Sequence, residues 1–238
     1  LGDVGAFDIL GNETAEVPLA QAAWHMLRRP YIGVRPVKYN YTPYKGVWRG
    51  TNCFASWSWR NCEGNKAVVE IYSTGDYCEL YLNGKRLGRK KLRDYKATFN
   101  TKYESGKLSV KAFSKDGKCV GENMLESAVG DLKIRLDSDN MTIKPKGIAY
   151  IDISVVGENG IVECNADVLL RVKVDNGVLI GFGSANPRTE ERFTAGEYSS
   201  YYGKAQAVVA ATETSPVKVT VTGEGIGEQS IEIQVEKA

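Results

Sequence analysis

Two tryptophans, Trp57 and Trp59, stand two positions apart in the run A-S-W-S-W. On a strand, residues with this spacing share one face, which is the arrangement that a platform for stacking sugar rings requires. The same spacing suits two core residues, because sandwich cores commonly bury a tryptophan and a platform must leave a large apolar area exposed. We favour core or interdomain packing and keep carbohydrate contact as the alternative.

A second group of aromatic residues lies in residues 39–50, a stretch rich in Tyr, Pro and Gly that lacks clean alternation and predicts a connector. Tyr41, Tyr44 and Trp48 could contact carbohydrate at the rim of a neighbouring active site, or they could pack between domains. The sequence does not separate these two interpretations, and packing is the one we favour.

Metal and cofactor chemistry has no support in the sequence. The five cysteines share no metal-ligand spacing, no C-x-x-C occurs, and His25 is the only histidine. The cysteines suit buried free thiols, although Cys53 and Cys62 could pair if the protein is exported. We therefore predict no metal site and no cofactor. The compartment stays open, with a periplasmic or secreted bacterial protein favoured over a cytoplasmic one.

The charge balance argues against a nucleic-acid partner. The chain has 238 residues, of which 31 are basic and 29 acidic, a net charge of +2. A dense basic run, K-R-L-G-R-K-K-L-R at residues 85–93, is interpreted as a solvated hairpin edge where lysines discourage edge-to-edge pairing. No apolar run approaches the roughly 20 residues that span a bilayer. The length suits two domains of modest size.

The pattern that positions these residues is that of short β-strands. Residues 68–88, V-V-E-I-Y-S-T-G-D-Y-C-E-L-Y-L-N-G-K-R-L-G, alternate in hydrophobicity and predict an antiparallel meander. Its first turn is Thr74-Gly75-Asp76, and its second is Asn83-Gly84, a dipeptide typical of a type I′ hairpin. A further hairpin is predicted from residues 107–113 and 118–125, joined by Lys115-Asp116-Gly117.

One helix is predicted, over residues 15–27, with Thr14 as its N-cap and Pro30 as its stop. The other segments with strand patterns are residues 54–59, 66–73, 78–82 and 96–101 in a first sandwich, and 132–136, 151–155, 168–174, 178–182, 205–211, 217–222 and 229–235 in a second. The long loop of residues 183–203 is either a functional or interfacial loop or a solvated crossover between sheets.

These patterns bring a family into view. The run E-I-Y-S-T-G-D-Y-C-E-L-Y-L-N-G-K-R-L-G, followed by L-S-V-K-A-F-S-K-D-G-K-C-V-G, resembles the β-sandwich that follows the catalytic barrel in bacterial glycoside hydrolase family 2 enzymes of the β-galactosidase type. The N-terminal F-D-I-L-G and the helix ending in W-H-M-L-R-R-P-Y-I-G-V-R-P are similar to the end of the family's (β/α)8 barrel. The segments from residue 134 onward resemble the bacterial immunoglobulin-like domain that commonly closes these enzymes.

The resemblance implies where catalysis does not lie. A retaining glycosidase needs a nucleophile and an acid/base carboxylate about 5 Å apart. The family's acid/base glutamate follows an asparagine, as Glu13 follows Asn12, but the family pair ends a middle barrel strand, whereas this pair precedes the last helix. We therefore interpret Glu13 as a helix-initiating charge and assign no catalytic residue in this chain.

The resulting prediction is an all-β chain: two immunoglobulin-like β-sandwich domains preceded by a short helical remnant of a (β/α)8 barrel. The expected boundaries are residues 1–45 for the end of the barrel and the connector, 46–130 for the first sandwich and 131–238 for the second.

The function implied by the resemblance is that of non-catalytic C-terminal domains. Their parent would be a retaining exo-β-galactosidase, with the catalytic barrel upstream in the same polypeptide, the carbohydrate substrate bound through that parent, and homo-oligomerisation open. The N-terminus accordingly reads as an interior point of a longer protein. Two alternatives are an independent carbohydrate-binding module and an immunoglobulin-like adhesin repeat pair. The pattern alone would support only a pair of β-sandwiches.

Overall fold

The chain folds into two compact units in the computed structural model, which describes residues 5–37 and 50–236. The first unit comprises residues 1–127 and the second residues 128–238. In the described part of the chain there is one helix, α1 (Glu16–Ala23), and every other regular element is a strand. The prediction of an all-β sandwich protein is confirmed.

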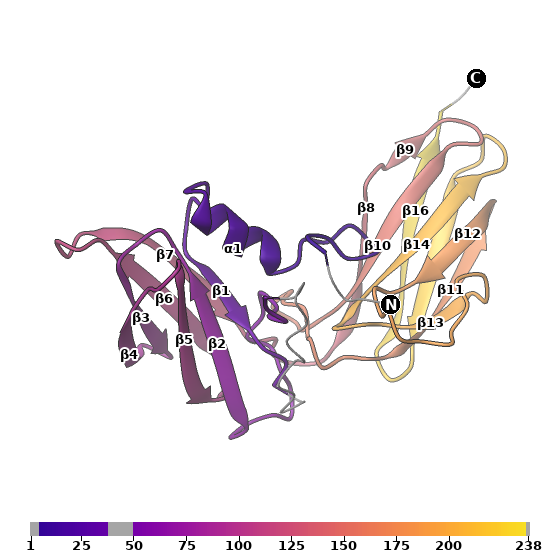
Figure 1. Cartoon of the computed structure of the whole chain (residues 1–238). Helices are drawn as coiled ribbons and strands as arrows, with labels where there is room; N and C mark the ends of the chain where they lie inside the picture. The colour runs from indigo at the N-terminus through magenta and orange to yellow at the C-terminus, as the bar shows by residue number, and fades with distance from the viewer. Residues whose placement is uncertain (1–4, 38–49, 237–238) are drawn as a thin grey trace. The chain divides into compact units, whose positions relative to one another are not determined.

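Two antiparallel sheets build the first unit (Figure 1). One sheet has the strand order β1 (Tyr31–Val34), β2 (Lys66–Tyr72), β5 (Lys96–Lys102). The other has the order β4 (Lys85–Lys91), β3 (Tyr77–Leu82), β6 (Lys107–Phe113), β7 (Cys119–Glu126). Burial alternates along β3 and β6, so one face of this sheet is turned toward the core.

The two hairpins with clear turn chemistry form as predicted. Asn83 and Gly84 both have positive φ, 50° and 80°, and they join β3 to β4 with Leu82 opposite Lys85. This is the geometry that a type I′ turn requires of both central residues. The turn at Lys115-Asp116-Gly117 likewise joins β6 to β7.

The meander predicted for residues 68–88 is wrong in its first half, because β2 and β3 belong to different sheets, whereas β3 and β4 pair as predicted. Strand β2 pairs with β1 and β5, and residues 73–76 carry the chain across to the other sheet. The physical reason lies in the burial of β2: its last four residues are all buried, so the strand is covered on both faces. The sequence of the turn after β2 does not determine which strands β2 pairs with, because strand pairing depends on packing.

Helix α1 is shorter than predicted. It begins at Glu16, and Ala15, which makes no side-chain capping bond, occupies the N-cap position expected for Thr14. The Thr14 hydroxyl instead donates to the carbonyl of Gly5 at 2.8 Å. The helix ends at Ala23 because His25 adopts a positive φ of 57°, which an α-helix cannot continue.

The second unit is a sandwich of a four-stranded and a five-stranded sheet. The first sheet has the order β12 (Gly177–Gly183), β14 (Lys204–Ala211), β10 (Ile148–Val156), β8 (Lys133–Ser138). The second has the order β13 (Glu197–Ser199), β11 (Leu169–Asp175), β15 (Val217–Gly223), β16 (Gly227–Val235), β9 (Thr142–Ile143). All pairs are antiparallel except β16 with β9.

The core of the second unit follows the predicted alternation. Strands β14 and β15 bury every second residue, as a sheet with one face on the core requires. The seven predicted strands of this unit are confirmed. The short strands β9 and β13 were not predicted, since two or three residues carry no readable periodicity.

A buried ion cluster ties the β1–β2–β5 sheet together. The side chain of Glu70, on the central strand β2, is 0% exposed. Its Oε1 accepts hydrogen bonds from Nε and Nη2 of Arg35 at 2.9 and 2.5 Å, and its Oε2 contacts Nζ of Lys96 at 2.6 Å and the hydroxyl of Tyr72 at 2.8 Å. Desolvation raises the pKa of Glu70, but the hydrogen bonds from Lys96, Arg35 and Tyr72 outweigh it and hold the pKa below its usual value.

Close backbone packing accompanies this cluster. Gly33 of β1 lies directly opposite Glu70, and a Cβ at that position would lie 2.7 Å from Cβ of Cys53. Only glycine therefore lets residue 53 approach the strand. Tyr31 and Tyr72, the next cross-strand pair on the same face, stack with ring centroids 5.5 Å apart.

We predict that Glu70→Gln lowers the free energy of unfolding by about 3 kcal/mol or more, because it leaves Arg35 and Lys96 partly buried without their counter-charge. The matched control is Glu79→Gln, which breaks a pair with the 60% exposed Arg86 and should cost about 1 kcal/mol or less. Urea denaturation followed by circular dichroism measures both. Equal losses would contradict a special role for Glu70.

We also predict a pH signature. Because the pKa of Glu70 is lowered on folding from its ordinary value of 4.5, its contribution is complete above that value and is lost as the pH falls through the folded-state pKa. The stability difference between the wild type and Glu70→Gln should be constant from about pH 6 to pH 8 and shrink below about pH 4. A difference that grows on acidification would contradict the assignment.

Candidate functional site

Trp57 and Trp59, the pair that could form a sugar platform, lie in a segment that does not form the predicted strand. Residues 54–59 make a single bridge, between Phe54 and Val34. Side chains, rather than a neighbouring strand, satisfy backbone groups of this segment. The backbone N–H of Trp59 donates to the hydroxyl of Tyr103 at 3.0 Å, and the hydroxyl of Ser127 donates to the carbonyl of Trp57 at 2.5 Å.

Both indole rings are also held by hydrogen bonds. Nε1 of Trp57 donates to the carbonyl of Glu104 at 2.9 Å, and Nε1 of Trp59 donates to the carbonyl of Ser56 at 3.3 Å. The ring of Trp57 packs against Tyr103 with centroids 5.0 Å apart. Buried tryptophans commonly pair their N–H in this way.

Each tryptophan is 0% exposed, so the prediction that both are buried is confirmed. A stacking platform must present a ring face to solvent, and neither ring does so in this structure. Trp57 and Trp59 thus anchor residues 54–59 to the body of the first unit. The other members of the predicted contact set, Tyr41, Tyr44 and Trp48, lie outside the described residues.

The acidic residues near α1 are engaged in local structure. Glu13 forms a bridge with Phe7 and lies three residues before the helix, so its predicted place in helix initiation is wrong. The acidic residue in the first turn is Glu16, and its Oε1 accepts hydrogen bonds from the backbone N–H groups of Gly50 and Thr51 at 2.7 and 3.0 Å. Glu16 thereby fixes the chain that enters the residue 51–62 segment.

The loop of residues 183–203 folds back on its own unit. It carries strand β13, which pairs with β11, so the chain passes from one sheet to the other and returns in β14. Glu191 accepts hydrogen bonds from the N–H of Ser199 at 2.7 Å and from the hydroxyl of Thr189 at 2.8 Å. Phe193 stacks on Tyr198 with centroids 5.4 Å apart. These contacts make the loop a braced crossover between sheets.

The thiols do not form a reactive pair. Cys53 and Cys62 are both buried and no disulfide joins them, so the alternative of a pairing between them is not realised. Burial raises the pKa of Cys53 to about 12, as does the nearby negative charge of Glu70, which keeps the thiol protonated. Within residues 5–37 and 50–236, no group of three or more His, Cys, Asp or Glu residues could hold a metal ion.

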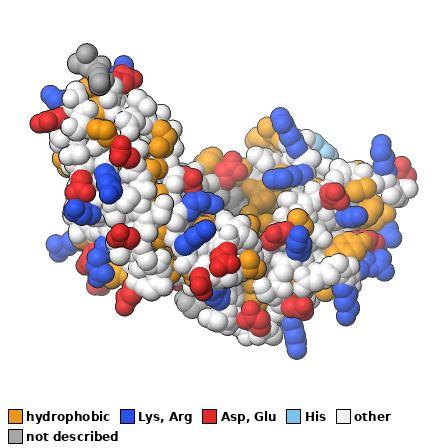
Figure 2. Space-filling model, turned by 180° about the vertical axis from the view of Figure 1, so that it is seen from behind, with side chains coloured by type: hydrophobic (Ala, Val, Ile, Leu, Met, Phe, Trp, Pro, Cys, Tyr) orange, Lys and Arg blue, Asp and Glu red, His pale blue; other side chains and the backbone are white. Residues whose placement is uncertain are grey.

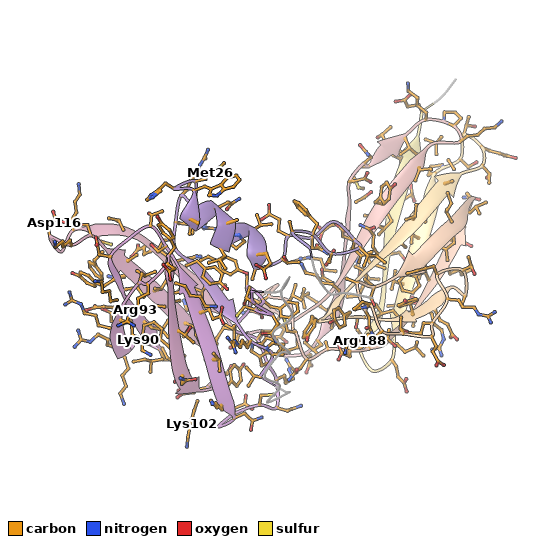
Figure 3. All side chains as sticks on the ribbon, viewed as in Figure 1. Met26, Lys90, Arg93, Lys102, Asp116 and Arg188 are labelled. Carbon is orange, nitrogen blue, oxygen red and sulfur yellow. The ribbon has the colours of Figure 1, made fainter. Side chains whose placement is uncertain are left out.

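Apolar side chains are exposed in the segments directly before and after α1. Phe7 and Ile9 precede the helix and are 57% and 61% exposed, while Trp24 and Met26 follow it and are 77% and 63% exposed. Met26 projects from the end of the helix in Figure 3. The opposite face packs on the unit through Ala15 and Ala22. Part of the surface around α1 is therefore left uncovered by the described residues.

No helix in the described part of the chain has the length and apolar character needed to cross a membrane. The fold and these residues together define a pair of β-sandwich units in which Trp57, Trp59, Glu16 and Glu70 serve local structure. This is the class of protein within which the comparisons place the chain.

The comparisons point to glycoside hydrolase family 2. Residues 132–232 match the model of the glycoside hydrolase family 2 C-terminal domain 5, and residues 64–121 match a domain of unknown function, DUF4982. A β-galactosidase of Bacteroides ovatus, BoGH2A, is 29% identical in an alignment that covers 97% of this chain and 28% of the relative.

Solved structures agree with this match. A family 2 glycosyl hydrolase from Bacteroides cellulosilyticus superposes with a TM-score of 0.86 at 27% identity over 99% of this chain and 32% of its own. A β-glycosidase from Bacteroides vulgatus, at 23% identity and a TM-score of 0.75 over 98% of this chain and 28% of its own, has the same fold. The resemblance to the C-terminal region of a family 2 glycoside hydrolase is confirmed, and the chain spans about a third or less of the relatives it matches.

We predict that Trp57→Ala and Trp59→Ala each lower the free energy of unfolding by roughly 3 to 5 kcal/mol, the range for large aromatic truncations in cores. Trp24→Ala is the matched control, since its side chain is exposed and should change stability by about 0.5 kcal/mol or less. Urea denaturation monitored by circular dichroism compares the three. Unchanged stability in the first two variants would be incompatible with an anchoring role.

Proposed function

We propose that this chain forms the non-catalytic C-terminal domains of a family 2 glycoside hydrolase, whose parent is a retaining exo-β-galactosidase. The observation that carries the proposal is the unequal coverage of the match to the β-galactosidase of Bacteroides ovatus, which includes 97% of this chain but 28% of the relative. The remaining length of such a relative has room for the catalytic barrel that a glycosidase of this type requires.

The carboxylates of the first unit support a non-catalytic role. A retaining glycosidase places two carboxyl groups about 5 Å apart on either side of the scissile bond. Glu70 is buried and both its oxygens are occupied by donors, and Glu16 is bound to two backbone N–H groups. Glu70 therefore has no free oxygen to present to a substrate, and Glu16 is held against the backbone of Gly50 and Thr51.

The exposed apolar side chains support an attachment to an upstream barrel. Phe7, Ile9, Trp24 and Met26 flank α1, the element that resembles the last helix of that barrel. Large exposed apolar groups on a soluble protein tend to be covered by another surface. In the parent, the barrel would cover them and bind the carbohydrate substrate, whereas in the isolated chain they would favour self-association.

An independent carbohydrate-binding module fits less well. Such a module would stack sugars on exposed rings, and the tryptophans that could have formed its platform are buried. An accessory role in a larger enzyme needs no platform of this kind.

We predict that the isolated chain does not hydrolyse p-nitrophenyl β-galactoside, β-glucuronide or β-mannoside, because the two carboxylates that the reaction requires would lie in the upstream barrel. Release of p-nitrophenol measured at several enzyme concentrations is the assay. The Glu13→Gln variant serves as a check on residual signal. Turnover that rises with protein concentration and disappears in this variant would overturn the proposal.

A further inference from the structure

The chain is nearly neutral as a whole, but its two units carry formal charges of opposite sign. Residues 1–127 carry 20 basic and 13 acidic residues, a formal charge of +7. Residues 128–238 carry 11 basic and 16 acidic residues, a formal charge of −5. A charge of this size concentrated in one unit creates a field that attracts anions.

The basic charge of the first unit gathers on strand β4. Residues 85–93 contain six cations and no acidic residue. Strand β4 lies at the edge of its sheet, where its backbone pairs with β3 alone. Several Lys and Arg side chains lie on the right side of Figure 2, and Figure 3 labels Lys90 and Arg93 in the region of β4.

The register of β4 with β3 shows which face of the sheet each of these cations lies on. Arg86, Arg89 and Lys91 lie on the outer face of the sheet, beside Tyr81, Glu79 and Tyr77. The guanidinium of Arg89 lies 3.6 Å from the ring centroid of Tyr77, which fixes its position. Lys90 turns the other way and donates to the carbonyl of Thr98 at 2.6 Å.

Three of the cations have no internal partner. Lys85, Lys91 and Arg93 form no ion pair with another described residue, and all three are exposed. Arg86 contacts Glu79 at 3.2 Å. The edge thus presents charges that the rest of the described unit does not neutralise. One lysine would be enough to discourage strand pairing at an edge, so protection against aggregation does not account for all six.

We propose that the β4 edge, defined as residues 85–93, binds a linear polysaccharide that carries carboxylate or sulfate groups. The strand supplies a track of about 23 Å, interrupted by a bulge at Leu87, since a strand rises about 3.3 Å per residue. Cations spaced along an open track complement a linear polyanion better than a small ligand, which would need a concave site. The choice of a polysaccharide rests on the proposed function.

Other polyanions fit this surface less well. Single-stranded nucleic acid needs free aromatic faces on which bases stack, and here Tyr77 is covered by Arg89 on one side and stacks on Phe113 with centroids 5.1 Å apart. A membrane surface favours an apolar stripe beside the cations, and Leu87, at 36% exposure, is the large hydrophobic residue exposed on β4. Nucleic acids and anionic vesicles become outcomes of the test.

The test is affinity for a size-fractionated heparin oligosaccharide, which is sulfated, and for oligogalacturonate, which is carboxylated, measured by isothermal titration calorimetry from about 50 to about 200 mM salt. The variant combines Lys85→Gln, Lys91→Gln and Arg93→Gln, none of which breaks an internal ion pair. We expect the wild type to bind at least one oligosaccharide with an affinity that falls as salt rises. The variant should bind on the order of tenfold more weakly, with a shallower salt dependence.

The matched control combines Lys66→Gln, Lys102→Gln and Lys115→Gln, which remove the same charge from other exposed positions of the unit. It should retain binding within about threefold of the wild type, since screening limits distant charges. An equal loss of affinity in both variants would mean that only the net charge of the unit matters, and would overturn the proposal. Failure to bind either oligosaccharide at the lowest salt would also overturn it.

Competing partners are tested in parallel. Tighter binding to duplex DNA, to single-stranded DNA or to phosphatidylglycerol vesicles than to both oligosaccharides would reject a polysaccharide. Binding and hydrolysis have separate readouts, so the failure of one proposal can be told from the failure of the other. If the β4 variant aggregates but binds the oligosaccharides as the wild type does, the cations only prevent strand pairing between molecules, and the proposal is wrong.

Discussion

The architecture of the first unit depends on one buried carboxylate. Glu70 lies on the central strand of its sheet and has no contact with solvent, yet it stays ionised because three partners reach it: Arg35 from the position after β1, Lys96 from β5 and Tyr72 from β2. A buried charge without its partners is costly. The three strands must therefore keep their order, and the chain that leaves β1 must pass where Arg35 can reach.

This constraint connects the N-terminal segment to the sandwich. Strand β1 and helix α1 were expected to belong to the end of another domain, but β1 pairs with β2 along its length, and Ala15 and Ala22 pack with Tyr72 and Cys53. The segment thus has one face built into the sandwich and another with exposed apolar groups. An element with these two faces is suited to join a sandwich to a catalytic domain.

The sequence predicted those features that depend on local chemistry. Asn83-Gly84 specified a hairpin because few dipeptides tolerate positive φ at both positions, and the alternation in β14 and β15 specified a core face. It failed where the outcome depends on distant partners. The glutamate in V-V-E-I-Y looked like an ordinary strand residue because its cations lie 35 and 26 positions away. The predicted strand of residues 54–59 does not form, because side-chain hydrogen bonds from distant residues hold this segment in place of a strand partner.

The central claim, that this chain is the accessory region of a glycosidase and attaches through the α1 segment, can be tested by hydrogen exchange. Amide exchange of residues 5–29 would be compared in the isolated chain and in the polypeptide in which the proposed barrel precedes it. The account predicts that exchange around Phe7 and around Trp24 slows markedly in the longer polypeptide, while exchange in β14 and β15 is unchanged. Equal exchange around Phe7 and Trp24 in the two proteins would contradict it.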